Sequence, residues 1–277
     1  MKRFDVLQFN KAFTHGGVFH ADDVFSTALI KLLNPDIEII RGFQIPEDFH
    51  GIVYDIGGGQ FDHHQTEKEL RASGTPYAAF GLLWRSYGHM LVEDEEVADF
   101  DKLFVEPLDL ADNTGVFNAV ANIISKLNPS WEEDSASDDA FDRAVDMAMV
   151  ILDNYVKDYG AKRKARVEVE KHISDSKILV LPKYVPWKTA VCHRDIYYVV
   201  FPSARGGYNV QAVPVSVDDA TLKKGFPQAW RGCMNQELRE KTKVKTAVFC
   251  HSSGFLCVAE TQTDAIRLAE LSIEALI

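Results

Sequence analysis

AFTHGGVFHADD, residues 12–23, decides how the chain begins to fold. Residues 12–14 continue an apolar run from residues 6–9, which predicts a first strand. The pair Gly16-Gly17 supplies a turn, and between residues 22 and 33 the apolar side chains recur with the period of a helix face. The stretch therefore predicts a strand, a turn rich in histidine, and a helix that opens on two aspartates.

The same alternation of strand and helix continues along the first half of the chain. Further strands are expected at residues 37–42 and 52–56, and further helices at residues 77–91, 97–110 and 116–126. The first of these helices has Thr75 as its expected cap and Pro76 at its first position. The alternation predicts an α/β fold, with a mostly parallel sheet flanked by helices on both faces. Functional residues in such folds lie beyond the carboxyl ends of the strands.

The second half of the chain has a different texture. Residues 129–139 are polar and acidic, and residues 140–172 predict a long, highly charged helix. Short β-rich runs then follow at residues 178–181, 196–201, 208–215, 246–250 and 256–259, before a final helix at 263–276. We therefore expect an N-terminal α/β domain at 1–132, a connecting helical segment at 133–176, and a smaller C-terminal α+β domain at 177–277.

The composition limits the location and the partners of the protein. Its 46% hydrophobic and 26% charged residues are typical of a soluble globular protein. No apolar run approaches the roughly 20 residues that cross a bilayer, and the first residues do not form a signal peptide, so we expect a cytoplasmic protein without a membrane partner. A net charge of −11 predicts no broad basic face for duplex nucleic acid and favours short or small phosphorylated substrates.

Three clusters of histidine and aspartate each follow an expected strand: residues 15–23, Asp55, and Asp62-His63-His64. Imidazole and carboxylate together suit Mn²⁺, Fe²⁺ or Zn²⁺, and one carboxylate can bridge two such ions. Taken singly, a histidine is usually a surface residue, and Asp22 or Asp23 reads equally well as a helix cap. The combination of three clusters at strand ends favours a metal site.

The spacing H-x4-H-x-D of residues 15–22, the isolated Asp55 and the Asp62-His63-His64 run resemble the DHH phosphoesterase superfamily. Within it, residues 14–22, 54–58 and 62–65 are similar to the MYG1 family (UPF0160) of metal-dependent exonucleases. Weaker similarities extend the resemblance over nearly the whole chain, at residues 108–113, 209–214, 230–232 and 251–255.

The resemblance implies a set of metal ligands, with Asp55 as the bridging carboxylate. The expected ligands are His15, His20, Asp22, Asp55, His63 and Asp112. His20 stands where many DHH enzymes have an aspartate, and Asp23 is expected to cap the helix or support the ligands. Asp109 competes with Asp112, because residues three apart share a helix face. His64 is expected to face the substrate phosphate and to be catalytic together with Asp55 and Asp22.

The resemblance also implies that the C-terminal domain holds the substrate. Arg205, Gly206 and Gly207 are expected to contact a phosphate or base, since the arginine offers a fork and the glycines expose backbone N–H groups. A plain hairpin turn explains the two glycines equally well. His251 and Ser253 resemble a substrate loop of the family. Trp230 is either a stacking platform for a base or a core residue.

The predicted activity is hydrolysis of a phosphodiester by water that two divalent ions, most simply Mn²⁺, activate. The resemblance points to 3′-to-5′ degradation of a short single-stranded nucleic acid, and we also consider a homodimer. One alternative is hydrolysis of a small molecule such as pyrophosphate, a cyclic dinucleotide or a nucleotide. A second alternative is a sensor that binds a nucleotide through its metals without cleaving it.

Overall fold

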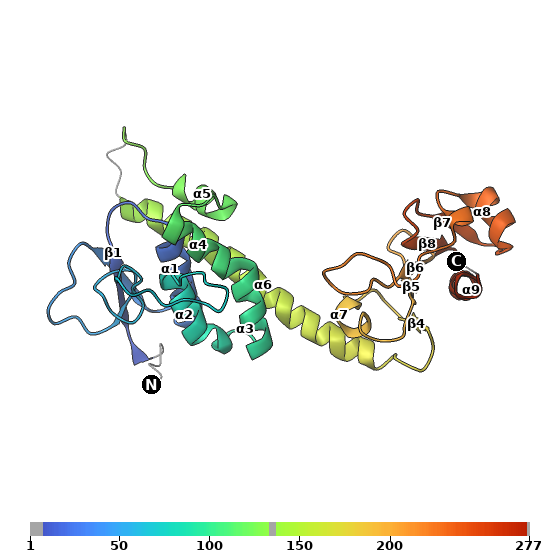
Figure 1. Cartoon of the computed structure of the whole chain (residues 1–277), viewed down its shortest axis with the longest axis horizontal. Helices are drawn as coiled ribbons and strands as arrows, with labels where there is room; N and C mark the ends of the chain where they lie inside the picture. Colours follow the sequence, from blue (N-terminus) through green and yellow to red (C-terminus); the bar gives the residue numbers. More distant parts are fainter. Residues whose placement is uncertain (1–7, 133–136, 276–277) are drawn as a thin grey trace. The chain divides into compact units, whose positions relative to one another are not determined.

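The structure is a computed structural model that describes residues 8–132 and 137–275. It contains two compact units, Met1–Gly160 and Ala161–Ile277 (Figure 1). The parallel sheet in the first unit and the mixed sheet in the second confirm the predicted α/β class, while the DHH-type assignment of the first domain remains a prediction. The expected borders at residues 132 and 176 remain predictions.

The described part of the first unit is built on a parallel sheet with the strand order β2-β1-β3. The central strand β1, Lys11–His15, lies between β2, Glu38–Gly42, and β3, Ile52–Val53. β3 is shorter than expected, because the backbone of Asp55 turns into the left-handed region with φ 56°. Of the expected strand at residues 6–9, residues 6 and 7 lie outside the described residues, and residues 8 and 9 are not strand.

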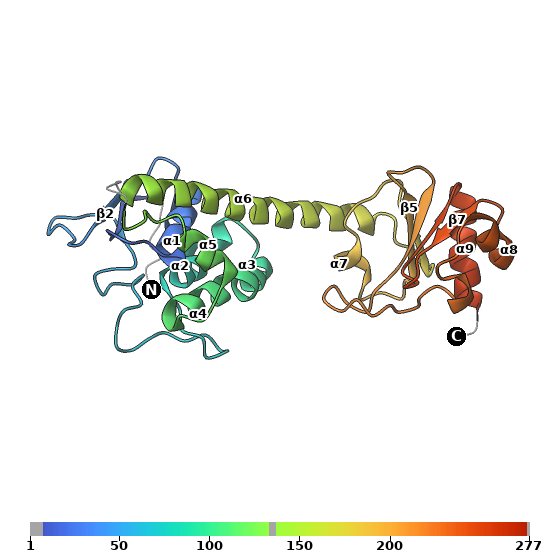
Figure 2. The ribbon, with the colours of Figure 1, turned by 90° about the horizontal axis from the view of Figure 1, so that it is seen from above.

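Helices pack on this sheet around one apolar core. They are α1 (Ala21–Leu33), α2 (Ala79–Tyr87), α3 (Asp94–Phe100), α4 (Glu106–Thr114), α5 (Ala119–Ser125) and α6 (Ser137–Glu170). Phe25 of α1, Phe80 of α2 and Phe141 of α6 are fully buried in the same cluster, and α6 passes beside α1 (Figure 2). Each such ring contributes about 1.5–3 kcal/mol by leaving water.

Several helix boundaries differ from the prediction. α2 begins at Ala79 rather than after Thr75-Pro76, because the Asp22 carboxylate accepts the first N–H groups of that helix. The hydroxyl of Thr75 instead donates to Glu106. Two short helical turns also appear: η2 (Gly88–Met90) follows α2, and η3 (Asp101–Val105) is a π-turn that joins α3 to α4. α5 begins only at Ala119, where the Asn118 side chain caps it.

The second unit is a mixed sheet with the strand order β4-β5-β6-β8-β7 within its described residues. Its strands are β4 (Ile178–Val180), β5 (Tyr198–Pro202), β6 (Tyr208–Ala212), β7 (Ala247–Cys250) and β8 (Leu256–Ala259). The helical elements are α7 (Lys188–Val191), η4 (Gln228–Trp230), α8 (Asn235–Thr242) and α9 (Gln262–Glu274). The sequence predicted α9, whereas α7 and α8 were not predicted. Trp230 is buried in the core, which is the second of its two interpretations.

Throughout the two described stretches, every helix is too short or too polar to span a lipid bilayer.

Candidate metal centre

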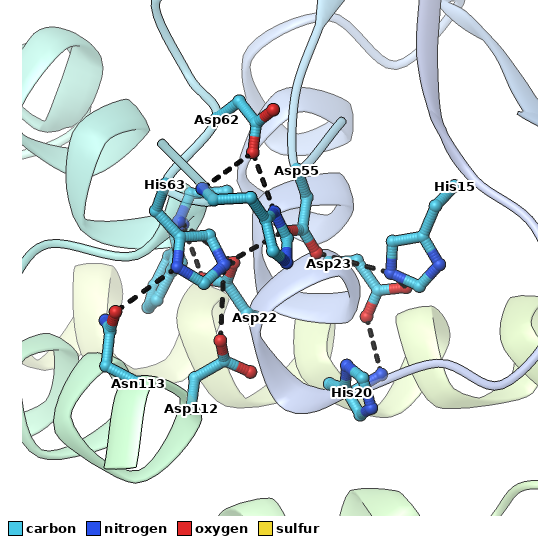
Figure 3. Close-up of polar contacts among 12 residues, drawn as sticks. His15, His20, Asp22, Asp23, Asp55, Asp62, His63, Asp112 and Asn113 are labelled. Atoms are coloured by element: carbon cyan, nitrogen blue, oxygen red, sulfur yellow. Dashed lines mark hydrogen bonds and ion pairs between the residues drawn. The ribbon is translucent and has the colours of Figure 1, made fainter. Parts of the chain in front are cut away.

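The side chains of the three predicted clusters meet at the carboxyl end of the parallel sheet (Figure 3). β1 ends at His15, and α1 opens with Asp22 and Asp23 in its first turn. Asp55 follows β3, and His63 lies on the loop beyond it. α4 then supplies Asp112. Within the described residues, three groups of histidine and aspartate bring their ligand atoms within 4.8 Å of one another.

His63 is the centre of the first part of the cluster. Its Nε2 lies 3.1 Å from Oδ1 of Asp55, 3.3 Å from Oδ2 of Asp112 and 3.7 Å from Oδ2 of Asp22. Its Nδ1 lies 3.4 Å from the side-chain oxygen of Asn113. Because that oxygen only accepts, Nδ1 carries a proton. Nε2 faces the carboxylates and is therefore the nitrogen that would bind a metal ion after losing its own proton.

His15 is the centre of the second part. Its Nε2 lies 3.3 Å from Oδ2 of Asp23 and 3.3 Å from Oδ2 of Asp55. Its Nδ1 donates to the Gly16 carbonyl at 3.1 Å, so Nε2 again faces the acidic groups. Asp55 thus presents Oδ1 to His63 and Oδ2 to His15.

Asp55 holds this position with a backbone conformation that few residues adopt. Its φ of 56° is in the left-handed region, where aspartate and asparagine are enriched among non-glycine residues. Its N–H donates to the carbonyl of Phe61 at 2.9 Å, which fixes the loop on the other side. Such strain persists only where the surroundings impose it, and it concentrates at functional sites.

The cluster carries more negative charge than its surroundings neutralise. Burial raises the pKa of Asp23 to about 7, and burial followed by the charge of Asp55 raises that of Asp22. Burial also raises the pKa of Asp112. Burial acts in the same direction on Asp55, but hydrogen bonds from His15 and then His63 outweigh it and lower its pKa to about 2.

Protons on the two histidines balance part of this charge. The hydrogen bond to Asp55 is the largest cause that raises the pKa of His15 to about 9. Even so, Oδ2 of Asp23 is buried without a hydrogen bond from any described residue. Crowded carboxylates, one of which has a buried oxygen that accepts no hydrogen bond within the described chain, beside imidazoles whose Nε2 faces them, fit divalent cations such as Mn²⁺, Fe²⁺ or Zn²⁺.

His64 lies at the edge of the cluster and is held by Asp62. Its Nδ1 donates to Oδ1 of Asp62 at 2.7 Å, while the side chain is 63% exposed. The other oxygen of Asp62 accepts the Gly58 N–H at 2.6 Å. Burial would raise the pKa of Asp62, but these hydrogen bonds lower it. Asp62 therefore remains an anion that orients the exposed imidazole.

Two predicted ligands have other neighbours. His20 is exposed; its ring lies 6.0 Å from that of His15, and its backbone N–H donates to Asp23 at 2.8 Å. None of the three groups includes it, whereas Asp23 lies with His15 and Asp55. The metal-ligand role of His20 remains a prediction. Asp109 is buried against Arg71, 2.7 Å away, so Asp112 alone of these two aspartates joins the cluster.

Asp23 was expected to cap the helix or support the ligands, and its Oδ1 does accept the His20 N–H at the start of α1. Its proximity to His15 and Asp55 was not predicted. Consecutive residues at a helix start diverge by about 100° around its axis. Asp22 and Asp23 can therefore serve two different groups, as they do here: Asp22 lies with His63 and Asp23 with His15.

The cluster lies in a cleft of about 920 Å³ in the first unit, whose lining also includes the loop between α4 and α5. The predicted substrate residues of the C-terminal half belong to the second unit. Arg205, Gly206 and Gly207 form the turn between β5 and β6, where both glycines have positive φ, as a tight hairpin requires. His251 and Ser253 lie in the β7–β8 turn, with His251 Nδ1 2.9 Å from Ser253 Oγ. Their contact with a substrate remains a prediction.

Comparison with known proteins places the chain among its relatives. A family profile described as "Uncharacterised protein family (UPF0160)" and labelled MYG1_exonuc matches residues 11–273. The MYG1 protein of Saccharomyces cerevisiae is 29% identical, over 94% of this chain and 94% of its own length. The human protein named MYG1 exonuclease is 27% identical, over 94% of this chain and 85% of its own length. A MYG1 protein of Chlamydia pneumoniae is 26% identical, over 94% and 96%.

No solved structure matches the chain. The family profile, by contrast, covers almost all of its 277 residues, from the first strand to the last helix. The chain therefore belongs to the UPF0160 family, the family of the MYG1 proteins.

Proposed function

We propose that the chain is a metal-dependent phosphodiesterase of the DHH type that removes nucleotides from the end of short RNA or other oligonucleotides. The observation that carries the proposal is the position of Asp55, whose two oxygens face His15 and His63. One carboxylate shared by two donor groups is the arrangement of two-metal phosphoryl chemistry. Relatives named MYG1 exonuclease support a nuclease-type hydrolase.

Two of the three groups give donor sets for two divalent ions, of which Mn²⁺ is our first choice; the third, Asp55, His63 and His64, shares its first two members with them, and we assign His64 to the substrate. The first set is His15, Asp23 and Asp55, and the second is Asp22, Asp55, His63 and Asp112. Asp23 replaces His20 in the set that the family resemblance implied. Bound ions supply Lewis-acid activation of water and of the phosphoryl oxygens.

The chain's own residues then position the phosphate. His64 is exposed in the cleft and held through Nδ1 by Asp62, so its Nε2 is left to face the substrate and donates to a phosphoryl oxygen when both ring nitrogens carry a proton. A phosphate enters only when cations offset the buried carboxylates, because these repel it otherwise. We propose cleavage in the 3′-to-5′ direction in the cytoplasm. Arg205, Gly206, Gly207, His251 and Ser253 are proposed to contact the substrate from the second unit.

A small phosphorylated molecule is a second candidate substrate, and one observation favours it. Among the described residues that line the cleft, Lys68 is the single lysine and there is no arginine. A long strand gains affinity chiefly from lysine and arginine contacts to its phosphates. A cleft with one such residue suits a chain end, a dinucleotide or a nucleotide better than a long strand.

A direct assay tests the proposal. The wild type, Asp55→Asn and the exposed control Asp36→Asn are loaded with Mn²⁺ and incubated with a 5′-labelled ten-nucleotide RNA. We expect the wild type and the control to shorten the RNA one nucleotide at a time, and Asp55→Asn to leave it intact. Pyrophosphate and a cyclic dinucleotide, measured in parallel, test the second candidate. A wild type with bound Mn²⁺ that hydrolyses none of these substrates would sink the proposal and favour a sensor.

A further inference from the structure

The cleft contains an exposed apolar surface beside the metal centre. Val18, Val116 and Phe117 line the same cleft as the metal cluster, with 68%, 50% and 78% of their surface exposed. They come from two loops, since Val18 follows β1 and the other two residues join α4 to α5. Single exposed apolar side chains are ordinary. A group of them next to a catalytic cluster marks a place where a ligand is bound.

The backbone on both sides of Phe117 is anchored although its ring is exposed. Gly115 ends α4 in the left-handed conformation, and its N–H donates to the Ala111 carbonyl at 2.8 Å. The side-chain oxygen of Asn118 caps α5 by accepting from Val120 at 2.9 Å. A ring on an anchored loop has two side-chain torsions to order, so it binds a flat partner at small entropic cost.

Phe117 is also close in sequence to Asp112, one of the proposed metal ligands. It follows Asp112 by five residues, so the two α-carbons are at most about 18 Å apart. The last residues of α4 shorten this span, because a helix rises only about 1.5 Å per residue. Phe117 and the proposed metal ligand Asp112 therefore belong to one short, anchored segment.

The charge of the cleft indicates what the ring binds. Lys68 is the single lysine or arginine among the described lining residues, and its Nζ donates to the side-chain oxygen of Asn113 at 2.6 Å. One cation provides little affinity for a polyanionic backbone. Base stacking on an aromatic ring is the other general source of affinity for single strands, and it tolerates every base.

We infer that Phe117 is the stacking platform for the nucleobase beside the scissile phosphate, with Lys68 next to that phosphate. This inference rests on the proposed function and narrows its substrate to a chain end recognised through one terminal base and its phosphate. It also explains how nucleic acid binds in a cleft whose described lining contains a single lysine and no arginine.

The test compares a substrate with bases and one without. The two substrates are a diadenosine dinucleotide and its base-free analogue, which has hydrogen in place of both bases. The rate of hydrolysis of each is measured for the Mn²⁺-loaded wild type and for the variants Phe117→Ala, Phe117→Trp and Phe43→Ala. Phe43 is a matched control, since it is 83% exposed in the same unit and does not line the cleft. Phe117→Ala is expected to lower kcat/KM for the dinucleotide about 5- to 150-fold, and for the base-free analogue less than twofold. Phe117→Trp should retain the wild-type preference, and Phe43→Ala should change neither rate.

Binding supplies a readout that is independent of turnover. The Mn²⁺-loaded proteins are titrated calorimetrically with AMP and with ribose 5-phosphate. Phe117→Ala should weaken the binding of AMP and leave the binding of ribose 5-phosphate unchanged. The inference would be overturned if Phe117→Ala lowered kcat/KM equally for the dinucleotide and its base-free analogue, or if it bound AMP as tightly as the wild type. The proposed phosphodiesterase activity would not be affected by either result. If the wild type cleaves neither dinucleotide, the proposed function fails, and the AMP titration still decides whether Phe117 binds a base.

Discussion

Replacing Asp55 by asparagine should greatly weaken the binding of Mn²⁺. Asparagine tolerates the φ of 56° at this position and keeps the side-chain volume, so the change removes mainly charge. For the wild type, Mn²⁺ at a hundred times its Kd adds about 2.7 kcal/mol of stability. In a unit of 160 residues, this raises Tm by about 5–11 °C. Both donor sets include Asp55, so the variant's rise should stay below about 2 °C.

The metal-free variant should also be less stable than the metal-free wild type. The pKa of Asp55 is lowered to about 2, so its charge contributes stability above the unfolded value of 3.8 and loses it as pH falls through 2. At pH 7 the contribution is complete and amounts to about 2 kcal/mol. Thermal unfolding in EDTA and in Mn²⁺, with Asp36→Asn as the surface control, measures both effects. An undiminished Mn²⁺-induced rise in Tm for Asp55→Asn would refute the shared-ligand arrangement.

Three further perturbations test separate parts of the centre. Asp109→Asn should lower the free energy of unfolding by up to about 3 kcal/mol but keep the Mn²⁺-induced rise in Tm. Asp112→Asn should abolish that rise. Thermal scans that show the reverse pattern would make Asp109 the ligand. His15, whose pKa is raised to about 9, stabilises the metal-free protein fully below pH 6.5 and loses this effect as pH rises through 9. The same proton competes with Mn²⁺, so calorimetry should show affinity rising about tenfold per pH unit between these values, and a flat profile contradicts this competition. Asn113→Ala removes the acceptor at His63 Nδ1 and should weaken Mn²⁺ binding about 10- to 100-fold; an unchanged Kd would show that the hydrogen bond orients nothing.

The elements that the sequence predicted well are those whose signals are local. α1 combines an apolar period with a turn before it and a proline after it, and the structure places it at Ala21–Leu33. α8, Asn235–Thr242, lacks such a period, since Leu238 is the single apolar residue in its sequence. α2 has a signal at Thr75-Pro76, but its start is set by Asp22, 57 residues before Ala79. A cap supplied from that far away leaves no trace in the local sequence.

The candidate site shows the same division. The rule that parallel strands end at one edge was enough to predict that the loops after β1 and β3 would bring His15, Asp55 and His63 together. The choice between Asp109 and Asp112 depended on α4, which follows the π-turn η3. A π-turn inserts a residue into the helix, so the face of α4 cannot be extrapolated from α3.

Asp22 joins the centre to the framework in a way that affects how any variant at this position is interpreted. Its two oxygens accept the N–H groups of Ala79 at 2.9 Å and Phe80 at 2.7 Å, while it also lies in the cluster around His63. A single carboxylate thus caps a distant helix and belongs to the candidate metal centre. A loss of activity after its removal would therefore combine two effects, an unravelled first turn of α2 and a lost metal ligand. In the described part of the chain Asp112 does not cap a helix, so a variant at Asp112 tests the metal centre alone.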